Sequence, residues 1–379
     1  MSPPMSARLV LILCSAWDLP LPCLPLPREG GDAMAEYEVR LTVLTPLHLR
    51  QPSERRAGWD FVPEGGRLWV LDLNRVYREL WGGSGPVPTP LELLRGRRAA
   101  PYATYSLRLL GEAPQSYWPL MRGPMDQQPY IPGSSLKGLM RTALLWHLFN
   151  GALPELGNSA RTAAQPLELA AFGHDPSGRR HPNYSLARAV LPEDLRPVGE
   201  AECWVAPAYA YALDGAGRLV RRVPLGHLEV VAPGASFHGR LKIDEWLLAR
   251  GELHFPDSSL QAARRFPQAL TEFGRALLAA EVRFYRAGQE RRLADRLEGL
   301  GPGQGAVACL GWGGGWASKT VGLKLRAEDV RRVAQRFALR RWQGRHFPNR
   351  FPASRRLVMG PDGPLPLGWV RIELHPRGG

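Results

Sequence analysis

The sequence has 379 residues, 44% of them hydrophobic, which is enough to bury a sizeable core and excludes a disordered or fibrous protein. Its formal net charge of +14 indicates a polyanionic partner, and residues 281–356 concentrate that charge, with 17 Lys and Arg against 6 Asp and Glu. Because 12 Trp and 10 Tyr accompany the charge, RNA is favoured over a membrane or an acidic protein, since bases stack on aromatic rings.

Residues 1–33 are predicted to be a disordered extension or a start site placed too far upstream, with secretion as the alternative. Their apolar run is too short to span a membrane and leads into proline-rich sequence. The cysteines are Cys14, Cys23, Cys203 and Cys309, and their spacing matches neither a disulfide framework nor a zinc site. We therefore expect a reducing, cytoplasmic location and predict no metal or other cofactor.

The periodicity of apolar residues predicts strands and helices in alternation along the chain. The expected elements are a strand over 38–45, a strand over 67–71, a helix over 73–81, a helix that follows residues 130–135, a hairpin over 209–223, a strand pair over 229–231 and 237–243, a helix over 259–285, a helix over 328–342 and a strand over 370–374. Residues 150–200 are predicted to form a long loop with at most a short helix near 167–172. This order, without a fixed repeat, predicts an α+β architecture.

One candidate site is the segment from Ile131 to Arg141, in which a glycine turn leads into a helix. Such a helix start offers unpaired backbone N–H groups, and Ser134 or Ser135 is expected to cap it. Lys137 and Arg141 are four residues apart and are expected on one helix face, where together they would form a phosphate clamp. The alternative is an ordinary serine-capped helix with two solvated cations.

A second candidate site is the glycine-rich segment from Leu310 to Thr320, which also contains two tryptophans and Lys319. Glycines permit close approach of the backbone, and Trp and Lys can contact bases and phosphates. The alternative is a tight turn whose tryptophans belong to the core. An ATPase is rejected, because Ser318 stands where a P-loop needs glycine and residues 321–325 alternate like a strand.

No catalytic residues are predicted. His147, His174 and His181 have the chemistry for acid–base catalysis on RNA, and the last two lie in the predicted long loop. For His147, packing on its own helix is favoured. The familiar hydrolase and metalloprotease motifs are absent from the sequence.

Four segments resemble motifs of the RAMP superfamily of CRISPR-associated proteins. They are Thr45-Pro46-Leu47-His48, Ile131 to Arg141, Val230 to Phe237, and Gly311 to Thr320. The last segment, together with residues 351–357 and 366–369, is most like the fifth subunit of the type III-A Csm complex. Family members commonly carry glycines after the Thr-Pro-Leu-His segment, whereas Leu49-Arg50-Gln51-Pro52 follows it here.

The resemblance implies an α+β fold of ferredoxin-like modules with long insertions and a basic, helical C-terminal part. The chain would then divide into the extension 1–33, a RAMP domain over 34–245 with the insertion loop 150–200, and a helical, second RAMP-like part over 246–379.

The resemblance also implies a non-catalytic cap at the head of a Csm complex, which holds the 3′ part of the CRISPR RNA and supports its maturation. Its implied partners are CRISPR RNA, target RNA, a neighbouring RAMP backbone subunit and a recruited nuclease. The residues implied to bind RNA are His48, Gly133, Ser134, Ser135, Lys137, Arg141, Gly311, Trp312, Gly313, Gly315 and Lys319. Two alternatives stay open, a metal-independent CRISPR RNA endoribonuclease and a different RAMP subunit of a type III complex.

Overall fold

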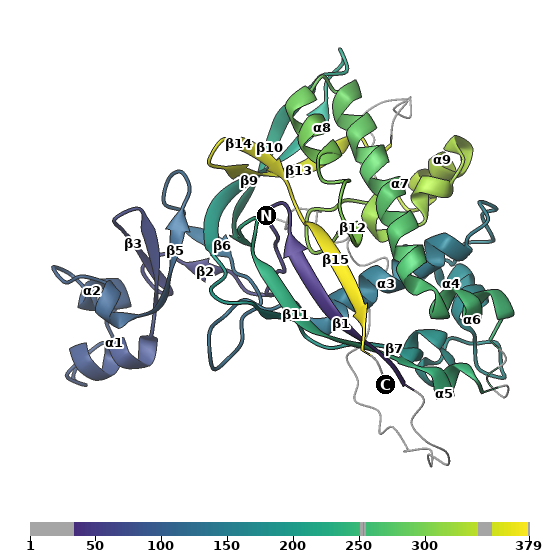
Figure 1. Cartoon of the computed structure of the whole chain (residues 1–379). Coiled ribbons are helices and arrows are strands. Elements are labelled where there is room, and N and C mark those ends of the chain that lie inside the picture. The colour runs from purple at the N-terminus through teal and green to yellow at the C-terminus, as the bar shows by residue number, and fades with distance from the viewer. Residues whose placement is uncertain (1–33, 251–252, 254, 340–350, 378–379) are drawn as a thin grey trace.

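The computed structural model describes residues 34–250, 253, 255–339 and 351–377, and within them the chain forms two β-sheets with helices packed against them (Figure 1). This arrangement confirms the expected α+β class. The prediction for residues 1–33 lies outside the described residues. The helix predicted over 328–342 ends at Arg336, so its predicted continuation over 337–339 is wrong, and residues 340–342 also lie outside the described residues.

The first sheet is built around β1 (Met34–Val43), which lies between β11 (Ser236–Asp244) and β15 (Trp369–Pro376). The outer strands are β12 (Ala306–Cys309), which pairs with β15, and β7 (Val190–Pro192) and β8 (Arg196–Pro197), which pair with β11. All of these pairs are antiparallel. Strands from before and after residue 245 thus share one sheet, and the predicted division of the chain at that residue stays a prediction.

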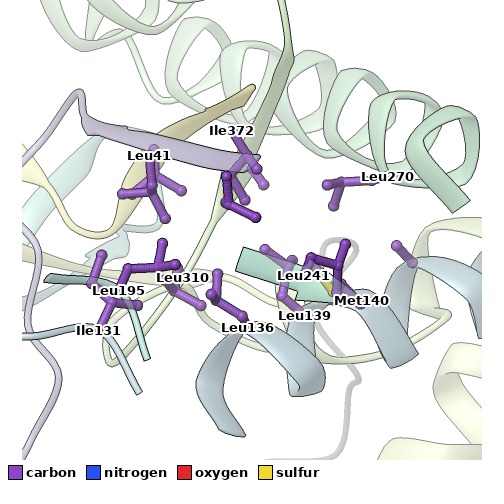
Figure 2. Packing of buried hydrophobic residues seen from close by; sticks show 14 of the residues in the cluster. Leu41, Ile131, Leu136, Leu139, Met140, Leu195, Leu241, Leu270, Leu310 and Ile372 are labelled. Carbon is purple, nitrogen blue, oxygen red and sulfur yellow. The ribbon is translucent and has the colours of Figure 1, made fainter. Parts of the chain in front are cut away.

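Two long helices and this sheet enclose the main core. Helix α3 (Gly133–Leu148) packs against α7 (Phe266–Ala287), which also lies against β12. Figure 2 shows Met140 of α3, Leu270 of α7 and Leu41 of β1 pointing into the same buried cluster. An antiparallel sheet packed against two helices agrees with the ferredoxin-like arrangement that the family resemblance implies.

The second sheet contains the predicted hairpin, formed by β9 (Cys203–Leu213) and β10 (Leu219–Val231). Its other strands are β2 (Arg55–Arg56), β3 (Phe61–Glu64), β4 (Arg67–Leu71), β5 (Ala103–Leu109), β6 (Ser116–Trp118), β13 (Ser354–Gly360) and β14 (Gly363–Pro366). Helices α1 (Leu73–Leu80) and α2 (Pro90–Leu93) lie with β3 at one end of the molecule (Figure 1).

Three predicted elements differ from the structure. Residues 229–231 and 237–243 do lie in strands, but the prediction that these strands pair with each other is wrong. The turn after β10 carries the chain into the first sheet, where β11 pairs with β1. The single helix over 259–285 is two helices, α6 (Asp257–Arg264) and α7, and Pro267 lies in the first turn of α7, where its missing N–H costs nothing. The strand expected over 321–325 is the 3₁₀ helix η8 (Gly322–Lys324).

The predicted loop over 150–200 contains more structure than expected. It includes α4 (Gln165–Phe172) and two 3₁₀ helices, η4 (Pro182–Tyr184) and η5 (Leu186–Ala189), as well as β7 and β8. The two strands have three and two residues, which is too short for a period of two to be recognised in sequence. Outside this segment, the other α-helices are α5 (Glu245–Leu248), α8 (Arg291–Glu298) and α9 (Ala327–Arg336). Two further 3₁₀ helices are η3 (Ala100–Tyr102) and η7 (Ala317–Lys319). None of the helices in the described residues has the length and hydropathy that a membrane crossing requires.

Lys324 ties η8 to the C-terminal end of α3. Its Nζ donates to the carbonyl oxygens of His147 at 3.2 Å and Phe149 at 2.9 Å, and it lies 4.2 Å from the centre of the Trp146 ring. A cation at this place satisfies terminal carbonyls and complements the negative end of the helix dipole. The segment therefore turns toward α3 instead of forming a strand.

Replacing Lys324 by methionine should lower the free energy of unfolding by about 1–3 kcal/mol, because charge-assisted hydrogen bonds to the helix end are lost. Urea denaturation, monitored by tryptophan fluorescence, measures this change in the free energy of unfolding. Lys242→Met is the matched control, since the ion pair of Lys242 with Glu36 (3.3 Å) is partly exposed and should contribute less than about 1 kcal/mol. Equal losses in the two variants would contradict the capping role of Lys324.

Candidate nucleic-acid interface

A groove of about 780 Å³ lies where three separate segments of the chain meet. The segments are residues 49–52 after β1, the N-terminal half of α3, and the glycine-rich segment after β12. From the residues predicted to bind RNA, the groove wall contains Ser134, Ser135, Arg141, Gly311, Trp312 and Lys319. The structure thus brings both predicted motifs into one site, although their nearest wall residues, Arg141 and Leu310, are 169 residues apart in sequence.

The N-terminus of α3 is capped by a residue from outside the helix. Neither Ser134 nor Ser135 caps it, contrary to the prediction, and the backbone N–H of Gly133 instead donates to Oδ1 of Asp194 at 2.7 Å. Gly133 is buried, and a Cβ atom there would lie 2.4 Å from the carbonyl oxygen of Pro192. The structure therefore indicates a packing role for Gly133 instead of the predicted contact with RNA, and it leaves the hydroxyls of the two serines at the groove.

The two cations of α3 have different surroundings. Arg141 lies at the groove, where its Nη2 is 3.2 Å from Oε2 of Glu168 and its guanidinium is 5.4 Å from the centre of the Phe172 ring. Lys137 is partly buried outside the groove wall, and burial, with the nearby charges of Arg141 and Arg188, lowers its pKa to about 8. A clamp formed by Lys137 and Arg141 stays a prediction, and the carboxylate of Glu168 already neutralises one half of it.

Backbone contacts hold the glycine-rich segment against the loop that follows β1. The N–H of Trp312 donates to the carbonyl oxygen of His48 at 2.8 Å. Gly311 has φ +77°, and a Cβ there would lie 2.5 Å from the same oxygen. Gly313, at φ +104°, lies against Leu367 in the same way, whereas Gly315 has open space around it. Gly311 and Gly313 thus act by permitting close packing.

The side chains of this segment provide an aromatic surface and a cation. Trp312 is half-buried, and the guanidinium of Arg356 lies 4.8 Å from the centre of its ring. Lys319 ends the 3₁₀ helix η7, lines the groove and, in the part of the chain that the structure describes, has no carboxylate within 4.0 Å. This combination suits a phosphate beside a stacked base.

His48 does not line the groove. Its side chain is fully buried, which is inconsistent with the predicted direct contact to RNA. Nδ1 lies 2.7 Å from the carbonyl oxygen of Glu229, so Nδ1 carries the proton, and the imidazole meets the Trp312 ring edge-on at 6.0 Å. The structure indicates that His48 packs against the buried side of Trp312 and supports it.

A buried ion pair underlies this support. Glu229 is fully buried, and its carboxylate accepts from Nε of Arg122 at 2.8 Å and from the backbone N–H of Leu120 at 3.1 Å. Arg122 in turn lies 4.1 Å from the centre of the Tyr105 ring. Because a buried charge is costly without its partner, this pair fixes the position of the Glu229 backbone to which His48 is bonded.

Sequence reasoning missed several residues of the groove, among them Arg50, Tyr130, Asp194 and Glu168. Arg50 had a signal in the sequence, since it closely follows Thr45-Pro46-Leu47-His48, which resembles a RAMP motif. Asp194 and Glu168 had none, because they come from the segment predicted to be a loop.

The histidines considered for catalysis lie elsewhere. Nδ1 of His147 is 2.8 Å from Oε2 of Glu272, while His174 and His181 make local contacts within the insertion and do not line the groove. In the described residues, no cluster of three or more His, Cys, Asp or Glu side chains could hold a metal ion.

Comparison with known proteins identifies the family. A family model described as the RAMP superfamily matches residues 40–301, which is more than half of the chain. The chain belongs to the RAMP superfamily. The matched region of this RAMP protein includes the loop after β1 and helix α3, and it ends before the glycine-rich segment. No curated protein matches the sequence.

Two solved structures resemble this RAMP protein over most of its length. One is a chain of the cryo-EM structure of a Csm–crRNA–target RNA ternary complex of a type III-A CRISPR-Cas system, with 22% identity, a TM-score of 0.68, and coverage of 89% of this chain and 100% of that one. The other is the crystal structure of T. onnurineus Csm5, with 22% identity, a TM-score of 0.60, and coverage of 88% and 99%. At this level of identity, the likeness shows a shared fold.

Burial of His48 predicts a pH-dependent stability. Burial lowers the pKa of His48 to about 4, against about 6.5 in the unfolded chain, so between these values only the unfolded state binds the proton. The contribution to stability is complete above pH 6.5 and is lost as the pH falls toward 4.

Between pH 7 and pH 5 this loss amounts to about 2 kcal/mol. Urea denaturation at both values should show that His48→Asn, whose amide can still donate to Glu229, loses about 2 kcal/mol less than the wild type over this interval. A variant with the same pH dependence as the wild type would contradict the burial of a neutral His48.

Proposed function

We propose that this RAMP protein is the CRISPR RNA-binding cap subunit of a type III-A (Csm) complex, that it holds the 3′ part of the CRISPR RNA and supports its maturation, and that it is not itself a nuclease. The observation that carries this proposal is the convergence of the loop after β1, helix α3 and the glycine-rich segment on one groove. The likeness to Csm5 and to a chain of an RNA-bound Csm complex supports it.

The groove offers the two kinds of contact by which single-stranded RNA is held. The hydroxyls of Ser134 and Ser135 and the ammonium of Lys319 can donate to phosphate oxygens. Trp312 and Tyr130 offer aromatic surfaces on which bases stack regardless of sequence. Binding of this kind tracks the backbone, which suits a subunit that leaves sequence recognition to pairing between guide and target.

The partners follow from the same proposal. A Csm subunit would contact a neighbouring RAMP backbone subunit, lie close to the target RNA and assist a recruited nuclease. The formal net charge of +14 is consistent with binding to a polyanion such as RNA. We further propose a cytoplasmic location, and the two described cysteines, Cys203 and Cys309, are free and buried, as suits a reducing compartment.

Reversing the charge of Lys319 tests the groove. The purified full chain should bind repeat-derived single-stranded RNA, and Lys319→Glu should weaken this binding roughly tenfold, because a charge-assisted contact is replaced by repulsion. Fluorescence anisotropy at several salt concentrations should also show a salt dependence shallower by about 0.7 in the slope of log affinity against log salt.

Lys242→Glu is the control for this experiment, because Lys242 carries the same charge on β11 and does not line the groove. Binding that is weakened equally by the two substitutions would reduce the effect to net charge. RNA binding that neither substitution changes would place the RNA elsewhere on the molecule.

The purified protein should leave the RNA intact, with or without magnesium. His174 and His181, the residues considered for metal-independent cleavage, do not line the groove where the proposal places the RNA. Incubation with end-labelled repeat RNA and gel analysis measures cleavage. Cleavage by the wild type that His174→Ala or His181→Ala abolishes would replace the non-catalytic function by the endoribonuclease.

A further inference from the structure

Arg50 lies over the ring of Trp118 at the groove. It is an exposed residue of the groove wall, and its guanidinium carbon is 3.2 Å from the centre of the Trp118 ring. In the described part of the chain, the Arg50 side chain has neither an ion pair nor a hydrogen bond, although Glu54 is near enough to act on its charge. The contact with the indole therefore holds the guanidinium, and its N–H groups have no acceptor among the described residues.

Trp118 is a firmly held platform for this contact. It ends β6 and lies opposite Leu228 of β10 in a parallel strand pair. Its ring packs against a buried cluster that includes Trp204 and Val358. Because the indole is held by the second sheet, it gives the Arg50 guanidinium a fixed aromatic surface to lie over at the groove.

The groove contains a second stack of the same composition. Trp312 also lines it, packs against the same cluster as Trp118, and carries the guanidinium of Arg356 at 4.8 Å. Two Arg–Trp pairs thus lie at the groove, each with one member in the groove wall and with its tryptophan packed against the same buried cluster. A phosphate alone would require only a cation, whereas a flat, preorganised surface matches a nucleobase.

We propose that the Arg50–Trp118 stack is a base-stacking position of the groove, on which an unpaired RNA base rests against the free face of the Arg50 guanidinium. The N–H groups at the guanidinium edge would then donate to an adjacent phosphate or to acceptors of the base. This inference rests on the proposed function and adds to it a residue that stands where family members commonly carry glycine.

The test separates the plane of Arg50 from its charge. Arg50→Lys keeps the charge and loses the planar stacking surface, so its affinity for a single-stranded, repeat-derived RNA should fall at least fivefold, the lower end of what one stacked base contributes. The salt dependence of binding should stay that of the wild type, because the number of cations is unchanged. Arg67→Lys is the matched control, since Arg67 is exposed on β4 outside the groove wall.

RNA carrying 2-aminopurine at successive positions would locate the base, whose fluorescence should be quenched by the wild type and recover in Arg50→Lys. An RNA made abasic at that position should bind the wild type and Arg50→Lys equally, which a purely structural role of Arg50 would not produce. Wild-type affinity in Arg50→Lys would overturn the stacking position and leave the proposed function intact. A folded wild type that binds no RNA would overturn both.

Discussion

The hydrogen bonding of β1 to β11 on one side and to β15 on the other fixes the place of two of the three segments that form the groove. Because these neighbours run antiparallel to β1, Val43 at the end of β1 lies opposite Val370 near the start of β15. Cys309 at the end of β12 lies opposite Trp369. The loops that follow β1 and β12 therefore leave the sheet at the same end of its strands. Strand register, established in the core, thus determines which surface residues meet.

The groove wall carries less net positive charge than the composition of the chain suggests. Of the cations that the structure describes between residues 281 and 356, only Lys319 lies in the groove wall. Arg141 is held by Glu168, and the positive end of α3 is met by Asp194. An internal carboxylate fixes the position of a cation and weakens its hold on a phosphate, so stacking becomes a correspondingly larger part of any affinity for RNA.

The sequence predicts what depends on neighbours along the chain. The strand Arg67–Leu71 has the predicted bounds, because alternation over five residues suffices to identify it. Pro267 also marks the start of α7 in the sequence, because proline is tolerated in the first turn of a helix and not in its interior. The cap of α3 and the burial of His48 could not be predicted, because the groups involved, Asp194 and Glu229, are 61 and 181 residues away in sequence. The convergence of the two motifs depends on the same distant pairing, and only the family resemblance anticipated a shared surface.

The Thr45 side chain accepts a hydrogen bond from the N–H of Trp369, a contact that joins residues 324 positions apart. During synthesis from the N-terminus, β1 must therefore wait for almost the whole described chain before β15 can occupy its second edge. An unpaired strand edge invites pairing with other chains. The groove is then among the last parts of the molecule to form, so a ribosome-bound or prematurely ended chain without β15 would lack it.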